Sequence, residues 1–167
     1  MKKEILSEIS LYHGDVSMPE GFEIDRDTFQ NNILEAQIYG KEFQFSKPVE
    51  MLNTYLREHI NLEYGFTLIN KKIWGNGYKP DTHSPPILNV DPVDLKNSAD
   101  YTLLYGVQVN DCMVRIHYDD NRRKGRSWDI SLANNKFIMF PSTLMYFISN
   151  SQKESLNFIA TITYDFA

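Results

Sequence analysis

The stretch that decides the fold runs from residue 112 to residue 147 and reads CMVRIHYDDNRRKGRSWDISLANNKFIMFPSTLMYF. Polar and apolar side chains alternate along its first part, and two further apolar runs, 136–140 and 143–149, follow a basic turn. Alternation with a period of two is typical of β-strands, because successive side chains point to opposite faces of a sheet. We therefore expect a series of short strands here, with no helix between them.

The same alternation extends to both sides of this stretch. Residues 101–109 (YTLLYGVQV), followed by a tight turn at Asn110-Asp111, predict a hairpin with 112–118. Residues 156–164 (LNFIATITY) predict a closing strand, and 66–74 (FTLINKKIW) predict another that stops at Gly75-Asn76-Gly77. About seven short strands without intervening helices indicate a β-sandwich or jelly roll.

Two helices are expected ahead of these strands. The first covers 25–39, with Asp25 or Asp27 at its start and Gly40 after its end. The second begins after Ser46 and ends before Gly65, and it carries an apolar stripe at helical spacing. The stripe comprises Val49, Leu52, Leu56 and Ile60. The expected architecture is therefore mainly β, a jelly roll (double-stranded β-helix) with two helices packed on one sheet face. It forms a single domain, 1–167, with a helical part at 1–65 and a jelly-roll part at 66–167.

Composition limits the possible partners and location. The formal net charge is −5, which repels phosphate backbones and speaks against nucleic acid as a partner. Cys112 is the single cysteine, so no internal disulfide forms, and we expect a reducing, cytoplasmic location. No apolar run reaches the length of a membrane span, so no membrane partner is expected. A protein partner or self-association stays open, and the strand expected at 143–149 would invite pairing if it lies at a sheet edge.

His117 and Asp119 are the first candidates for a metal site. They share one face of the strand at 112–118, two residues apart, while Cys112, Val114 and Ile116 share the other, more apolar face. One strand can offer two ligands to Fe(II) at this spacing, in a site of two histidines and one carboxylate. The other interpretation is a polar strand end that enters a solvated turn, and the shortness of the motif favours it.

The basic turn after this strand has two interpretations. Its guanidinium groups could hold a carboxylate or phosphate group, or they could pair with the neighbouring aspartates at 119, 120 and 129. Pairing is favoured, because the chain is acidic overall and has one short basic run. The candidate residues for binding an anion or partner are Arg115, Arg122, Arg123 and Arg126. A longer segment, 75–99, contains four prolines and predicts a long loop, which is either a functional lid or disordered.

Three pieces of the C-terminal half resemble the Fe(II)/2-oxoglutarate oxygenases of the prolyl-hydroxylase type, in particular small proteins carried by tailed marine phages. The matching pieces are residues 101–109, 136–142 (KFIMFPS) and 157–164 (NFIATITY). The resemblance covers roughly residues 66–165 and consists of short, mostly apolar matches. It implies a double-stranded β-helix, and it implies Fe(II) and 2-oxoglutarate as cofactors if the family's site is present.

The same resemblance implies that this site is incomplete. Tyr146 stands where the family has its second metal histidine, and Asn157 stands where an arginine holds the 2-oxoglutarate carboxylate. The first metal pair should lie between Trp74 and Tyr101, where His83 is the single histidine and Pro85 follows it two residues later. Tyr146 and Asn157 thus join the candidates for binding an anion or partner.

Two hypotheses follow from the sequence. In the first, the chain is a non-catalytic jelly-roll module for binding or assembly, for example in a phage, which presents 75–99 and 119–129 to a partner. In the second, it is an active Fe(II)/2-oxoglutarate oxygenase with an unusual ligand set, His83, His117 and Asp119. A sugar- or peptide-binding jelly roll is a third possibility.

Overall fold

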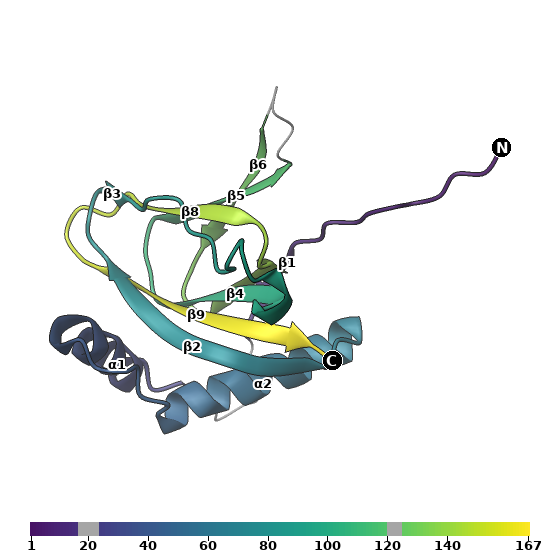
Figure 1. Cartoon of the computed structure of the whole chain (residues 1–167). Coiled ribbons are helices and arrows are strands. Elements are labelled where there is room, and N and C mark those ends of the chain that lie inside the picture. Colours follow the sequence, from purple (N-terminus) through teal and green to yellow (C-terminus); the bar gives the residue numbers. More distant parts are fainter. Residues whose placement is uncertain (17–23, 120–124) are drawn as a thin grey trace.

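The computed structural model describes residues 1–16, 24–119 and 125–167, except for the side chain of Asp119. Within these ranges nine strands, two α-helices and one short 3-10 helix follow each other along the chain (Figure 1). In order they are β1 (Tyr12–Asp15), α1 (Arg26–Tyr39), α2 (Lys47–Tyr64), β2 (Leu68–Tyr78), β3 (Thr82–His83), η1 (Leu95–Asn97), β4 (Tyr101–Gln108), β5 (Cys112–Asp119), β6 (Arg126–Leu132), β7 (Lys136–Pro141), β8 (Met145–Asn150) and β9 (Asn157–Phe166).

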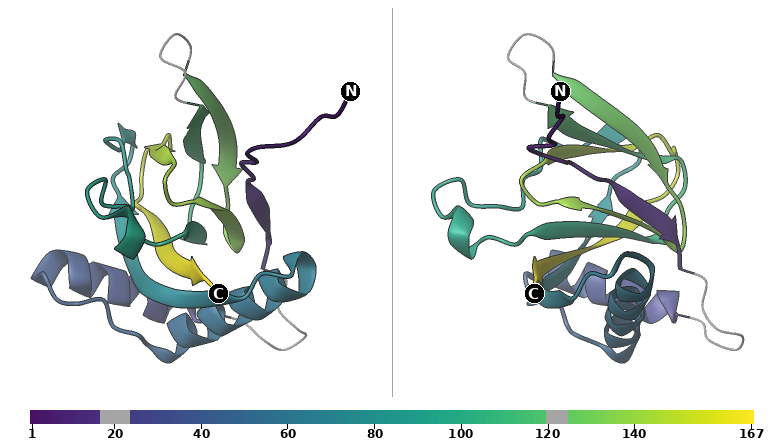
Figure 2. Two further views of the ribbon diagram at one scale, coloured as in Figure 1. Left: turned by 45° about the vertical axis from the view of Figure 1, so that its right-hand side comes forward. Right: turned by 90° about the vertical axis from the view of Figure 1, so that its right-hand side faces the viewer.

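The strands form two antiparallel sheets that face each other. The larger has the order β1-β7-β4-β9-β2, and the smaller has the order β3-β8-β5-β6. From β2 onward the chain passes from one sheet to the other at each step, with the β5–β6 pair as the exception. Both helices lie on the outer face of the larger sheet (Figures 1 and 2). A mainly β fold with two helices on one sheet face is thereby confirmed.

Both helices begin and end where local chemistry predicts. The Asp25 side chain accepts a hydrogen bond from the Thr28 amide at 3.0 Å, which satisfies a free donor at the start of α1. Gly40 and Gly65 follow the two helices with φ of 62° and 72°, a conformation that suits glycine. Ser46 precedes α2 without capping it through its side chain, and its hydroxyl instead accepts a hydrogen bond from Asn32 at 2.5 Å.

Neither of the described helices is long and apolar enough to cross a membrane.

Two apolar layers hold the molecule together. The helix-side core lies between the larger sheet and the helices, and the inter-sheet core lies between the two sheets. The helix-side core includes Phe29, Ile33, Leu52, Leu56, Ile60, Leu103, Phe137, Ala160, Ile162 and Tyr164. The inter-sheet core includes Leu104, Cys112, Val114, Ile116, Ile130, Leu132, Ile138, Phe140, Tyr146 and Ile159. Strands β4, β7 and β9 supply residues to both layers, because alternate side chains point to opposite faces.

The expectation that Gly75-Asn76-Gly77 ends a strand is wrong, because β2 continues through it to Tyr78 and pairs with β9. These glycines are instead sites where α1 approaches the sheet closely. A Cβ atom on Gly75 would lie 2.4 Å from Cγ1 of Ile33. At Gly77 the amide donates a hydrogen bond to the Gln37 side chain at 3.0 Å. The missing side chains therefore serve helix packing and leave the strand intact.

The expected hairpin of 101–109 with 112–118 is also wrong. β4 pairs with β7 and β9 in the larger sheet, whereas β5 pairs with β6 and β8 in the smaller one. The tight turn at Asn110-Asp111 is present, with Asp111 at a φ of 48°, but it carries the chain from one sheet to the other. β4 lies between β7 and β9 at the centre of the larger sheet, so both of its edges already have partners. It is also buried on both faces.

Two further expectations about the edges are corrected. The segment 1–65 is not helical throughout, because β1 forms one edge of the larger sheet by pairing with β7. The strand at 143–149 is not an edge strand, since β8 lies between β3 and β5. In the part of the chain that the structure describes, the strands at the ends of the sheets are β1, β2, β3 and β6.

Candidate functional site

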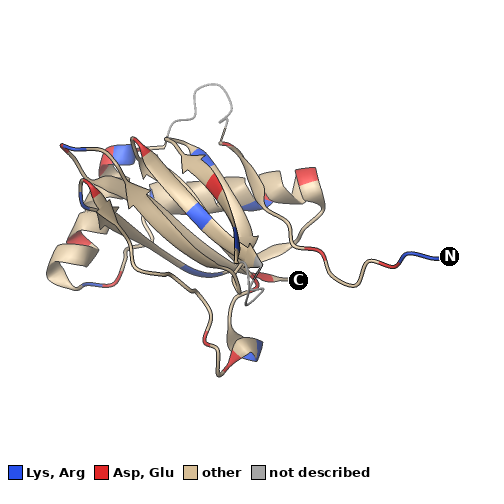
Figure 3. Cartoon of the chain, turned by 90° about the horizontal axis from the view of Figure 1, so that it is seen from above, with Lys and Arg blue, Asp and Glu red and all other residues tan. Residues whose placement is uncertain are grey.

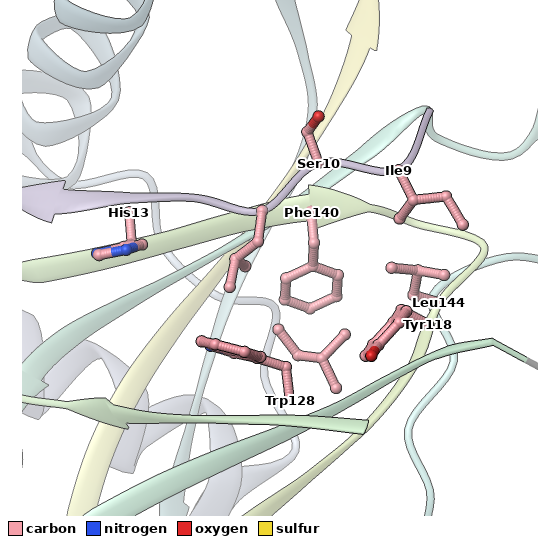
Figure 4. A pocket seen from close by; sticks show the side chains of 9 residues that line it. Ile9, Ser10, His13, Tyr118, Trp128, Phe140 and Leu144 are labelled. Atoms are coloured by element: carbon pink, nitrogen blue, oxygen red, sulfur yellow. The ribbon is translucent and has the colours of Figure 1, made fainter. Parts of the chain in front are cut away.

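A hollow of about 330 Å³ opens between the sheets, on the side where β1 and β6 form their edges (Figure 4). Its walls are aliphatic and aromatic, with a few polar groups, and among the described residues that line it there is no Asp, Glu, Lys or Arg. The lining consists of Ile9, Ser10, Leu11, His13, Ile116, Tyr118, Trp128, Phe140 and Leu144. Concave sites of this composition suit the apolar part of a ligand.

Strand register explains how the aromatic walls arise. Ile116 of β5 lies directly opposite Trp128 of β6, and both side chains lie on the inner face of the smaller sheet. Ile116 is 2% exposed, whereas Trp128 is 59% exposed. The difference follows from topology, because β6 is the last strand of its sheet and no further strand covers the indole. An exposed tryptophan beside a hollow is a typical anchor for a ligand or partner.

The floor of the hollow leads into the inter-sheet core. Phe140 of β7 packs edge-on against Tyr146 of β8, with ring centroids 5.1 Å apart. Tyr146 is buried, and its hydroxyl accepts a hydrogen bond from Asn89 at 3.0 Å. Burial raises the pKa of Tyr146 to about 12, so the phenol is neutral at physiological pH.

A network of neutral polar groups surrounds Tyr146. The Asn89 amide also approaches the hydroxyl of Thr102 at 3.3 Å, and Thr102 shares a hydrogen bond of 2.8 Å with Ser142. Asn89 comes from the expected loop at 75–99. That segment is more regular than expected, since β3 and η1 lie within it and Ile87 pairs with Tyr146 by backbone hydrogen bonds. Tyr146 is therefore a structural member of the interior, out of reach of a dissolved anion.

His83 and His117 both lie on the outer face of the smaller sheet. His83 shares a hydrogen bond of 2.8 Å with the hydroxyl of Ser149, its partner in β8. His117 pairs in register with Met145 of the same strand and packs on the ring of Phe147, with centroids 5.1 Å apart. The expected division of β5 is confirmed, since Cys112, Val114 and Ile116 are buried and His117 lies on the opposite face.

The two histidines are too far apart to bind one metal ion. Their partners Ser149 and Met145 are four residues apart on β8, which corresponds to about 13 Å along the strand. β8 also separates β3 from β5, which adds two strand spacings of about 5 Å each. Zinc and iron sites need ligand atoms about 2 Å from one ion. In the ranges that the structure describes, no three His, Cys, Asp or Glu side chains gather closely enough to hold a metal.

The residues of the smaller sheet therefore do not fit an iron centre of the oxygenase type. Asp119 pairs in register with Arg126, and its side chain lies outside the described part. The space between the sheets holds apolar residues together with neutral Asn, Thr, Ser and Tyr groups. Those groups are poor replacements for imidazole and carboxylate ligands.

The candidate cations of the basic turn are only partly described. Arg122 and Arg123 lie outside the described residues, and Arg126 is exposed at the start of β6. Arg115 of β5 forms a two-pronged ion pair with Asp129 of β6, at 2.7 and 2.9 Å. From the sequence, Asp129 was expected to pair with the basic turn. Among the described residues, the cation that binds it is Arg115, on the neighbouring strand β5. The hydrogen bonds from Arg115 lower the pKa of Asp129.

Charge is dispersed over the described part of the surface. Along the ribbon, Lys and Arg positions are interspersed with Asp and Glu positions (Figure 3). The expectation that nucleic acid is not a partner depends on this dispersion and on the net charge of −5.

Asn157 and Cys112 are also buried and have structural roles. The fully buried Asn157 amide accepts a hydrogen bond from the Asn110 N–H at 2.9 Å and donates one to the Asn110 carbonyl at 3.0 Å. It thereby fastens the turn between β4 and β5 to the start of β9. Cys112 is buried as expected, and burial raises the pKa of its thiol to about 12, which keeps it protonated and unreactive.

Sequence reasoning missed the hollow itself. Its lining comes from β1 and the segment before it, from β5 and β6, and from β7 with the turn after it. These segments are far apart in sequence, and no spacing rule connects them. One signal was available: Ile9 and Leu11 alternate with polar residues directly ahead of β1.

Comparisons with known proteins show a similarity in fold. No protein-family model matches the sequence, and no curated protein matches it. Among solved structures, the chain is similar to a prolyl-4-hydroxylase of Pseudomonas putida, with a TM-score of 0.64 and 11% sequence identity. The match covers 93% of this chain and 87% of that one. At this identity the likeness shows the fold alone, and it supports the expected similarity to the prolyl-hydroxylase fold.

Proposed function

We propose that the chain is a non-catalytic module for binding or assembly, built on a jelly roll (double-stranded β-helix) that lacks a complete metal triad. The jelly-roll assignment is supported by strand order, because the chain from β2 to β9 alternates between two facing sheets. The similarity to a prolyl-4-hydroxylase supports a common architecture. Fold by itself does not carry activity, so the function is argued from the site.

One observation carries the proposal: the space between the sheets ends in an aromatic hollow and is lined by apolar and neutral groups. A hollow with Tyr118, Trp128 and Phe140 in its walls suits an apolar side chain or a planar ring. The ring nitrogens of His13, which lines the hollow, could orient such a ligand. The binding site of the module is therefore this hollow, whereas we had expected the 75–99 loop and the 119–129 turn.

The alternative is an active Fe(II)/2-oxoglutarate oxygenase that uses His83, His117 and Asp119. The fold of the Pseudomonas putida prolyl-4-hydroxylase favours it. The positions of His83 and His117, on different strands and four register positions apart, weigh against it. We further propose a cytoplasmic location, consistent with the single buried thiol of Cys112, and a phage origin, which depends on the sequence resemblance alone.

A metal titration decides between the two functions. We expect Fe(II) and 2-oxoglutarate, added together without oxygen, to leave the melting temperature unchanged. Tight binding would stabilise the fold by about 2.7 kcal/mol at one hundred times the dissociation constant, which is several degrees for a chain of this size. A rise of that size that disappears in His117→Ala would contradict the non-catalytic proposal.

Binding in the hollow can be measured with a neutral apolar dye such as Nile red. Trp128→Ala should weaken dye binding at least about tenfold, since tryptophan anchors often contribute about 2 kcal/mol or more. Trp74→Ala is the matched control, because Trp74 lies on β2, away from the lining residues. Equal dye affinities in the wild type and both variants would show that the hollow is not the binding site.

A further inference from the structure

The segment before β1 extends away from the body of the molecule, and several of its apolar side chains are exposed. Residues 1–11 belong to no helix or strand, and the chain extends away from the sheets toward its first residue (Figure 1). Ile5, Leu6 and Ile9 are 74%, 94% and 51% exposed. We call residues 4–11 the arm. Neighbouring large aliphatic residues on an extended, uncovered segment are typical of a surface that another molecule covers.

The arm continues from a free strand edge and borders the hollow. β1 pairs with β7 on one side and is the last strand of its sheet, so its other edge has no strand partner among the described residues. Ile9 and Leu11 line the hollow, as does His13 within β1 (Figure 4). These residues are two apart, so an extended chain places them on one face, and Ser7 and Ile5 follow on that face.

On one face the arm pairs apolar with apolar residues about Ser7. In an antiparallel pair of arms centred on this residue, Ile5 of each lies opposite Ile9 of the other, on the same face of the pair. A two-fold interface requires this kind of match, in which each contact occurs twice. Since Ile9 already lines the hollow, the arm of a second copy would place its Ile5 beside Ile9 and close to Leu144 and Tyr118.

We infer that a second copy of this chain covers the hollow, through antiparallel pairing of the two arms about Ser7. This inference specifies the partner of the proposed binding module and therefore depends on that proposal. The pairing removes Ile5 and Ile9 from water and covers the open side of the inter-sheet core next to β1. Like other strand-addition modes of recognition, it joins two extended segments by main-chain hydrogen bonds.

Light scattering coupled to size exclusion tests the assembly. The full-length chain should be a dimer that dissociates on dilution, and Ile5→Asp with Ile9→Asp should raise the dissociation constant at least about tenfold. Ile38→Asp is the matched control, because Ile38 is a 67% exposed isoleucine on α1 and should leave the dimer unchanged. A wild-type chain that is monomeric at every concentration would overturn the inference.

Cross-linking tests the register. Ser7→Cys should form a disulfide-linked dimer under mild oxidation, since directly opposed residues in antiparallel strands have Cα atoms within the range that a disulfide spans. Ser155→Cys is the control, as Ser155 is exposed on a loop between β8 and β9. Equal cross-linking of both variants would overturn the two-fold register. These outcomes are independent of the metal titration: iron binding contradicts the proposed function, whereas a monomer without iron binding contradicts only the arm pairing.

Discussion

The two cores of this molecule share the larger sheet but differ in how they are closed. On the helix side, Val49, Leu52, Leu56 and Ile60 form a continuous stripe, and each is fully buried. Between the sheets, the smaller sheet closes most of the layer and leaves the hollow beside Trp128. A long helix can cover several strands of a sheet. The smaller sheet, in contrast, ends at β6 and leaves the indole of Trp128 exposed. Under the proposed function, stability depends on the helix-side core and recognition on the open end of the inter-sheet core.

The largest effect should come from breaking the closed layer. Leu56→Ala removes a fully buried side chain of α2, and we expect it to lower the free energy of unfolding by about 3 kcal/mol. The matched change at the hollow, Leu144→Ala, should cost about 1 kcal/mol or less, because Leu144 is already partly exposed. Urea unfolding of both variants measures the difference. Equal losses would mean that the hollow is packed as tightly as the helix side.

A smaller effect should come from separating α1 from the sheet. Gly75→Ala places a methyl group 2.4 Å from Ile33 and should destabilise the protein by about 2 kcal/mol. In an Ile33→Ala background the same change should cost much less, and a double-mutant cycle measures this coupling. Gly125→Ala is the control, because a Cβ there meets no atom within 4 Å. If the coupling were zero, Gly75 would not be the point of close approach.

The smallest effect should come from the outer face of the smaller sheet. The hydrogen bonds from Arg115 hold the pKa of Asp129 below its ordinary value of 3.8. A carboxylate with a lowered pKa in the folded state stabilises the fold above the unfolded pKa. This contribution is lost as the pH falls through the folded value. Asp129→Asn should therefore lower the melting temperature slightly at pH 6, and the difference should shrink as the pH falls from about 4 through the lower folded pKa.

Salt provides the control for this last prediction. The side chains of Arg115 and Asp129 are 56% and 42% exposed, so high salt should reduce the difference at pH 6. A difference that persists at pH 2 would show that Asp129 contributes through packing and not through its charge.

Much of the local structure could be predicted from the sequence. The Asp25 cap, the glycines at positions 40 and 65, and the apolar stripe of α2 depend on residues within a few positions of each other. The strands at 112–119, 126–132, 136–141, 145–150 and 157–166 also lie where alternation indicated. In β5 the alternation identified the buried face correctly. Short-range patterns report the conformation of a segment and which of its faces is apolar.

The candidate site could be predicted far less well. Tyr146 and Asn157 were singled out because of the residues they replace in the resembling family. Their roles are hydrogen bonds inside the fold, to Asn89 and to the backbone of Asn110. A tryptophan in an alternating strand is ordinarily a core residue, and only the position of β6 at a sheet edge explains the exposure of Trp128.

The sequence by itself determined where most helices and strands form and which face of each is apolar. It also showed a single cysteine and no closely spaced pair of histidines, so it contains no simple metal-binding motif of these residues. Only the tertiary structure decided that β4 and β5 belong to different sheets, that α1 packs against Gly75, and that His83 and His117 lie far apart. The physical reason is that alternation specifies the face of a strand but not its neighbour. Neighbours are chosen by contacts between segments distant in sequence, and the hollow exists only where such segments meet.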